Sequence, residues 1–200
     1  MSSAALIPLD NCPAWRAENG APVPRRVVAA DDTLSADAAY RLACEGTGLL
    51  WQGDFHNARQ LLQALARRTD RRPKKPKKAE SDVSPAQAFH LHRQTLGQRA
   101  RVLGMVLVPL NGDYTIPLRR APDLTYACTE AWGPATGEAC MVSLRELLGL
   151  VGAHEWRKKG VTIPALANVS YPRIHPHYGV FSPVRGEYVD LVATAPIRDT

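Results

Sequence analysis

A run of lysine, arginine and proline in the middle of the chain is the feature that most constrains how this sequence can fold. Of the 25 Lys and Arg residues, eight lie between Arg67 and Lys78, together with one of the 19 acidic residues. The rest of the chain therefore holds 17 basic and 18 acidic residues, so the formal net charge of +6 belongs to this short stretch. Because so charged and proline-rich a segment cannot enter a core, we expect residues 69–84 to form a solvated basic linker.

The length and composition indicate a soluble globular protein. A chain of 200 residues suits one ordinary domain, or a small helical unit joined to a second compact piece. No apolar stretch approaches the roughly 18 residues that a membrane span requires, so we expect no membrane association. The cysteines form no Cys-x-x-Cys pair, which favours reduced thiols in a cytoplasmic protein and leaves disulfide pairing as the alternative. They are Cys12, Cys44, Cys128 and Cys140.

The part of the chain before the linker predicts helices. Residues 1–33 are rich in alanine, proline and small polar residues without a sustained period, so we expect an irregular N-terminus. Leucines then recur at helical spacing after Ser35, a residue type that caps helices, and Asp54 can cap a second helix. The pattern over residues 34–68 therefore predicts a helical hairpin.

The part after the linker mixes helix and strand signals. Residues 85–101 are typical of a helix capped by Ser84. The aliphatic run Val102–Leu110, the turn dipeptide Asn-Gly and the return over Tyr114–Leu118 together predict a β-hairpin. Residues 143–159 predict a further helix that Gly160 ends.

These elements predict the α+β class. We expect an N-terminal helical hairpin and helices first, followed by a small antiparallel β-hairpin or sheet, with no complete Rossmann-like domain. The region 85–193 would form this small α+β part, and residues 194–200 a tail.

The segment 175–193, HPHYGVFSPVRGEYVDLVA, carries the clearest functional pattern. An aromatic residue, a proline, an arginine and an acidic residue stand there ahead of an apolar run. This pattern resembles the segment that precedes the first cofactor-binding strand of class I S-adenosylmethionine-dependent methyltransferases, especially the N5-glutamine and N6-adenine group. Residues 41–62 and 143–160 also look like the N-terminal region of such enzymes. By this resemblance the residues beside the S-adenosylmethionine pocket would be Phe181, Ser182, Pro183, Arg185 and Glu187.

The resemblance stops before the cofactor-binding motif. Class I enzymes hold the cofactor on a glycine-rich loop after a strand, and only seven residues follow Ala193 here. The resemblance therefore implies a truncated, N-terminal accessory region that recognises the substrate. Its methyl acceptor would be RNA, DNA or a protein, and the missing catalytic domain would be supplied in cis or in trans. We expect no methyl transfer by the isolated chain, and no catalytic residue can be named in it.

Other glycine and histidine patterns give little evidence for a cofactor or metal site. Gly46-Thr-Gly48 imitates a cofactor loop, but the third glycine is absent and no βαβ pattern follows, so close packing explains it better. His90 and His92 stand two apart in a predicted helix and point apart. His175 and His177 have no acidic or cysteine partner at a metal-ligand spacing, so we expect no metal site.

The basic linker has two interpretations. Its side chains can contact the phosphates of RNA or DNA in a salt-dependent way, or they can serve only as a charged tether. The alternative function is therefore a stand-alone module that binds a nucleic acid or an acidic partner, and a gene remnant without a function of its own is a third possibility. The nucleic-acid contacts would be Arg71, Arg72, Lys74, Lys75, Lys77 and Lys78.

Overall fold

The computed structural model describes residues 5–70, 84–168, 170–180 and 186–196. Within these ranges the chain divides into two compact units. The first unit runs to Thr125 and includes Ala135–Leu147. The second comprises Tyr126–Pro134 and the chain from Leu148 onward. Each unit is described by itself below.

The first unit is built on a six-stranded mixed sheet. Three neighbouring strands in its middle, β3, β4 and β5, run parallel, whereas β6 is antiparallel to β5 and β1 is antiparallel to β3. At the far edge β2 is parallel to β6. The strands in spatial order are β1 (Leu6–Ile7), β3 (Arg26–Ala30), β4 (Thr47–Trp51), β5 (Val106–Leu110), β6 (Cys140–Ser143) and β2 (Ala14–Arg16).

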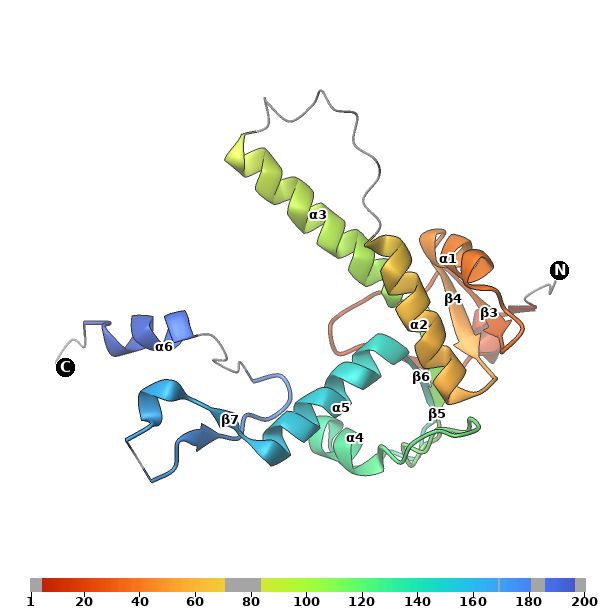
Figure 1. Cartoon of the computed structure of the whole chain (residues 1–200). Helices are drawn as coiled ribbons and strands as arrows, with labels where there is room; N and C mark the ends of the chain where they lie inside the picture. Colours follow the sequence, from red (N-terminus) through yellow and green to blue (C-terminus); the bar gives the residue numbers. More distant parts are fainter. Residues whose placement is uncertain (1–4, 71–83, 169, 181–185, 197–200) are drawn as a thin grey trace. The chain divides into compact units, whose positions relative to one another are not determined.

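Three helices connect the parallel strands. Helix α1 (Ala36–Cys44) joins β3 to β4, and helices α2 (Phe55–Thr69) and α3 (Pro85–Leu103) lie between β4 and β5 in the chain. The three helices contact one another, and α1 packs on β4 (Figure 1). Parallel neighbours need such crossover connections, and successive right-handed crossovers in one direction put their helices on the same face of the sheet.

The N-terminal segment packs against an apolar cluster of the sheet. The buried side chains of Val27, Leu50, Leu107 and Met141, one from each of β3, β4, β5 and β6, form this cluster. Packed against it are Ile7 of β1, Cys12 at the end of the short 3-10 helix η1 (Leu9–Asn11), and Trp15 of β2. The central strands are therefore enclosed, which explains why all five residues of β4 are buried.

The second unit contains short elements. Helix α4 (Thr125–Trp132) and most of helix α5 (Leu144–Lys159) belong to it, followed by an antiparallel pair of two-residue strands. Gly160 has a φ of 78° and ends α5, as its sequence position predicts. The remaining elements are β7 (Val161–Thr162), η2 (Pro164–Leu166), β8 (Arg173–Ile174) and α6 (Gly186–Ala193), with α6 beside η2.

The predicted helical hairpin over residues 34–68 is wrong in its middle. Residues 36–44 and 55–69 are helical and begin at the predicted caps, Ser35 and Asp54, but residues 47–51 form strand β4. A strand that is buried on both faces has a continuous apolar run rather than an alternation, so its pattern cannot be distinguished from that of a helix.

The predicted β-hairpin is wrong as well. Val106–Leu110 is strand β5, but Val102 and Leu103 end helix α3, and Tyr114–Leu118 is not a strand. The antiparallel partner of β5 is β6, which lies about thirty positions further along the chain. After β5 the chain turns back on itself, because the Asn111 amide donates to the Thr115 carbonyl and the Asp113 carboxylate accepts from the Thr115 amide.

The predicted order of helices followed by a small sheet also fails. The described part of residues 1–33, expected to be irregular, supplies β1, β2 and β3, so the sheet is assembled from both halves of the chain. The coarser class is confirmed, since the described residues combine helices and strands. The helix over residues 85–101 is confirmed and extends to Leu103, with Ser84 forming a capping box. None of the described helices is both long and apolar enough to cross a membrane.

Candidate functional site

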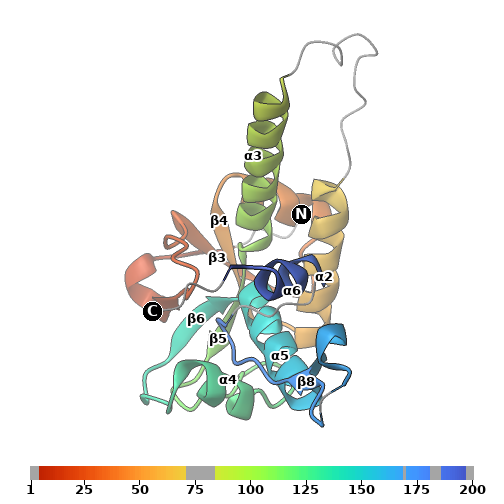
Figure 2. The same ribbon diagram turned by 90° about the vertical axis from the view of Figure 1, so that its left-hand side faces the viewer.

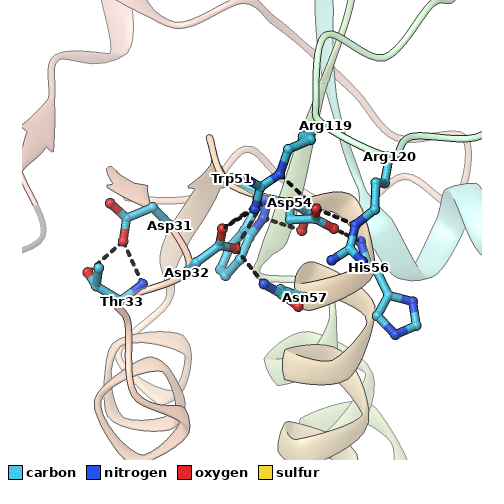
Figure 3. A network of polar contacts seen from close by, with 9 residues as sticks. All are labelled: Asp31, Asp32, Thr33, Trp51, Asp54, His56, Asn57, Arg119 and Arg120. Carbon is cyan, nitrogen blue, oxygen red and sulfur yellow. Dashed lines mark hydrogen bonds and ion pairs between the residues drawn. The ribbon is translucent and has the colours of Figure 1, made fainter.

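Charged side chains gather where the parallel strands β3 and β4 end. Asp31 and Asp32 directly follow β3, and Asp54 follows β4 by three positions at the start of α2. Arg119 and Arg120 reach this cluster from the loop after β5 (Figure 3). The carboxyl edge of parallel strands is the place where ligands most often bind in open α/β sheets, so this cluster is the candidate site of the first unit.

Asp54 is the centre of this cluster. Its side chain is fully buried, and one carboxylate oxygen accepts hydrogen bonds from Arg120 Nε at 2.5 Å and from Arg119 Nε at 3.0 Å. The other oxygen accepts from the His56 amide at 2.8 Å, which caps α2. Because the hydrogen bond from Arg120 favours the ionised form most, followed by the His56 amide and Arg119, the pKa of Asp54 is lowered to about 2.

Asp32, which follows β3, holds the start of α2 in place. One of its carboxylate oxygens accepts from the Asp54 amide and from Asn57 Nδ2, each at 3.0 Å (Figure 3). Its other oxygen lies 3.4 Å from Arg119 Nη2. Asp31 points to the other side, where the Thr33 side chain and amide donate to it and lower its pKa. Hydrogen bonds thus join the ends of β3 and β4 to the loop after β5.

The backbone of the arginine loop is fixed as firmly as its side chains. The Phe55 amide donates to the Arg119 carbonyl at 3.0 Å, and Asp54 and Arg119 form an isolated parallel bridge. Arg120 has a φ of 54°, in the left-handed region that non-glycine residues rarely adopt. Such strain persists only where the surroundings enforce it, and the buried Asp54 carboxylate supplies that constraint here.

Asp54 is suited to holding cations and not to general acid catalysis. A carboxyl group with a pKa of about 2 stays ionised near neutral pH and cannot serve as a general acid. The outer parts of the two guanidinium groups remain accessible, since the Arg119 and Arg120 side chains are 72% and 61% exposed. Among the described residues, no group of three or more His, Cys, Asp or Glu side chains could hold a metal ion.

The loops after β3 and β4 lack the glycine-rich sequence that holds S-adenosylmethionine in class I enzymes. The loop from Asp31 to Ser35 after β3 contains no glycine, and only Gly53 follows β4 before α2. A Cβ atom at Gly53 would lie 2.5 Å from Asp32 Oδ1, so this glycine makes room for a side chain of the protein itself. Gly48 lies within β4, where it packs against Pro24 and Leu107. Close packing between two helices is the sequence interpretation of Gly46 and Gly48, but Gly48 packs between β5 and Pro24, and a Cβ atom at Gly46 would have nothing within 4 Å.

Comparison of the chain with protein-family models, with curated proteins and with solved structures gave no match.

The second unit has a charged cluster of its own. Glu130 of α4 accepts from Arg157 Nε and Nη2 of α5, both at 2.5 Å, and lies 2.9 Å from His154 Nδ1. The Tyr126 ring meets the His154 ring edge-on at 5.4 Å. Arg157, first, and His154 lower the pKa of Glu130. Glu130 and His154 are largely buried, and each satisfies the hydrogen-bonding needs of the other. This cluster is therefore best explained as a polar contact that holds α4 against α5.

Most of the site residues predicted from the sequence lie outside the described residues. This holds for Phe181, Ser182, Pro183 and Arg185, and for the six basic residues of the linker from Arg71 to Lys78. Glu187 is described: it is exposed and lies in the first turn of α6. His90 and His92 lie on helix α3, as predicted, and all four cysteines are free thiols.

Sequence reasoning missed the arginine pair. Asp54 was predicted as a helix cap, which it is, but nothing adjacent to it indicates that it would be buried with two cations from 65 and 66 positions away. The only local signal is the dipeptide Arg119-Arg120 in a stretch otherwise poor in charge. That signal does not identify a partner.

Proposed function

We propose that this chain is the N-terminal, substrate-recognising region of an S-adenosylmethionine-dependent methyltransferase. The observation that carries the proposal is helix α6. In the family that the sequence resembles, the proline-arginine-acid pattern stands ahead of an apolar helix, and here helix α6 begins at Gly186, one residue before the acidic member of the pattern. The acidic member of the pattern, Glu187, lies in the first turn of this helix, where a carboxylate is favourable.

The side chains of α6 support a role in docking. Leu191 is 66% exposed and Val192 is 77% exposed, and Tyr188 lies one helical turn before them. Residues spaced three and four apart share a face of a helix. An apolar stripe of this kind suits contact with a further protein segment.

The chemistry would be divided between this chain and a cofactor-binding domain. The described strand ends lack the glycine-rich loop, so S-adenosylmethionine would bind to a domain supplied in cis or in trans. That domain would supply the methyl group. The contribution of this chain is to position the acceptor, which is the main source of acceleration in a displacement that needs in-line alignment.

The first experiment is to sequence the DNA beyond the codon for Thr200 in all three frames. The proposal expects a strand followed by an Asp-x-Gly-x-Gly pattern within about thirty codons. The longer protein would then transfer a labelled methyl group from S-adenosylmethionine, and the 200-residue chain would not. If no frame contains such a pattern, the cofactor-binding domain is not supplied in cis, and that form of the proposal is overturned. Methyl transfer by the 200-residue chain alone would contradict the proposal that a separate domain binds the cofactor.

A second candidate function is a binding module for a nucleic acid or an acidic partner, based on residues 67–78. The concentration of eight basic residues there, in a chain otherwise close to neutral, favours it. A salt titration of RNA binding tests it, repeated with the six Lys and Arg residues from Arg71 to Lys78 replaced by Gln. Binding that ignores salt, or that survives the replacement, excludes this module.

A further inference from the structure

Helix α3 is exposed to an unusual extent. Every residue from Ser84 to Gln98 is exposed, and burial begins only in the last turns, where Val102 and Leu103 join the core. Figures 1 and 2 show the N-terminal part of the helix projecting from the rest of the first unit in both views. Packing within the first unit therefore does not account for the residue types along this projecting part.

The charge on α3 is of one sign. No Asp or Glu occurs between Ser84 and Gly112, whereas α3 carries Arg93, Arg99 and Arg101. Arg99 is bound to Asp70 at the end of α2, with Nε 2.7 Å from a carboxylate oxygen, and it anchors the base of the helix. Arg93 lies on the projecting part. In the chain, the eight basic residues of 67–78 precede this helix, so the two stretches together favour a polyanionic partner.

The projecting part also carries an aromatic ring beside a cation. Phe89 is 58% exposed, and the guanidinium carbon of Arg93 lies 6.0 Å from the centroid of its ring. The His90 ring meets it edge-on at 5.8 Å. An exposed ring flanked by a cation is the combination on which nucleic-acid bases stack in single-strand binding proteins. It supplies the aromatic residue that the basic linker lacks.

The apolar residues of α3 do not form a continuous apolar face. Phe89 and Leu96 are seven positions apart and share a face, but the cation Arg93 lies between them on that face. Leu91 is also more than half exposed and points about 200° away from Phe89. A helix that lies on a membrane needs its apolar side chains on one face. The arrangement on α3 therefore favours a partner that contacts an individual aromatic ring and the cation beside it.

We propose that the projecting part of α3 binds single-stranded nucleic acid, with Phe89 stacking on a base and Arg93 contacting the phosphate backbone. This inference rests on the proposed function: if the chain belongs to a methyltransferase, the bound single strand is its methyl acceptor. The binding itself needs no cofactor. Its failure would leave a protein acceptor for the enzyme, whereas failure of methyl transfer would leave the binding intact.

The test is fluorescence anisotropy of the full 200-residue chain with a labelled single-stranded 20-nucleotide RNA of mixed sequence and with its duplex. Phe89→Leu keeps an apolar helix-forming side chain and removes the stacking platform, so single-strand affinity should fall roughly 5- to 100-fold while duplex binding stays unchanged. Arg93→Gln should lower the slope of log K against log salt by about 0.7, the amount for one phosphate contact on a single strand.

Matched controls come from exposed side chains elsewhere. Tyr171→Leu removes a ring that is 85% exposed, and Arg26→Gln removes a cation that is 59% exposed, and neither should change the affinity. Equal binding by Phe89→Leu and the intact protein overturns the proposal. It is also overturned if Phe89→Leu abolishes binding to vesicles of anionic lipid but not to RNA, or if it converts a dimer of the chain into a monomer in sedimentation.

Discussion

Arg120 donates its Nε–H to the buried carboxylate of Asp54 at 2.5 Å, across 66 positions of sequence. This ion pair joins the loop after β5 to the start of α2 at the carboxyl edge of the parallel strands. Burial of an unpaired carboxylate is costly, so the arginine loop and the helix start stabilise each other. The candidate site therefore exists only in the folded chain.

Replacement of Asp54 by Asn tests this relationship. Asparagine caps helices as well as aspartate does, so the variant removes the charge and keeps the cap. We expect a clearly lower Tm in a thermal unfolding experiment, because two cations lose their shared anion. Asp10→Asn, at an exposed aspartate, is the control and should shift Tm by no more than about 1 °C. Equal Tm values for the two variants would contradict a stabilising ion pair.

The same carboxylate predicts a dependence of stability on pH. The pKa of Asp54 is about 2 in the folded chain, below its ordinary value of 3.8, so the folded state holds the ionised form more tightly than the unfolded state does. Its contribution is complete above about pH 4 and is lost as the pH falls toward 2. Urea midpoints of the intact chain and of Asp54→Asn should therefore converge between these values. A gap that stays constant down to pH 2 would refute the linkage.

Two glycine-to-alanine changes should have opposite effects on the stability of the chain. At Gly48 in β4 a Cβ atom would lie 2.7 Å from Leu107 Cδ1 and 3.1 Å from Pro24 Cγ, so Gly48→Ala should destabilise the chain by about 1–3 kcal/mol through overpacking. At Gly97 in α3 nothing lies within 4 Å, and Gly97→Ala should stabilise by up to about 1 kcal/mol through helix propensity. Chemical unfolding measures both. A destabilising Gly97→Ala would argue against a solvated helix there.

Glu130→Gln should loosen the second unit. The change removes the anion shared by His154 and Arg157 and leaves buried donors poorly satisfied, at a cost of roughly 1–3 kcal/mol. Amide hydrogen exchange should accelerate in α4 and in the later turns of α5. Lys158→Gln breaks only an exposed pair with Glu155 and serves as the control. Unchanged amide hydrogen exchange in α4 would show that the contacts of Glu130 are not needed to hold α4 against α5.

Leu191→Asp separates docking from folding. Because this side chain is 66% exposed on α6, the Tm of the 200-residue chain should change by no more than about 1 °C. In a longer protein that transfers methyl groups, the buried charge should lower the rate of transfer at least about ten-fold through loss of docking. Leu6→Asp, at a leucine 65% exposed on β1, should leave the rate unchanged. Equal rates for both variants would exclude α6 as a docking surface.

Features that depend on neighbouring residues were predictable from the sequence. Ser35, Asp54 and Ser84 begin helices where the sequence predicts, because a cap acts within three residues of itself. Gly160 ends α5 for the same local reason, since its φ of 78° is easily adopted only by glycine. The sequence also predicted that residues 85–101 form a helix, which the structure extends to Leu103.

Features that depend on distant residues were decided by the tertiary structure alone. Strand β4 has no alternation because neighbours on both faces bury it, and β5 pairs with β4 and β6 instead of with the residues after its turn. The candidate site follows the same logic: Asp54 acquires its lowered pKa from arginines of another loop. A short motif fixes where a helix starts, whereas strand pairing and buried charge pairs depend on which distant residues the packed sheet brings together.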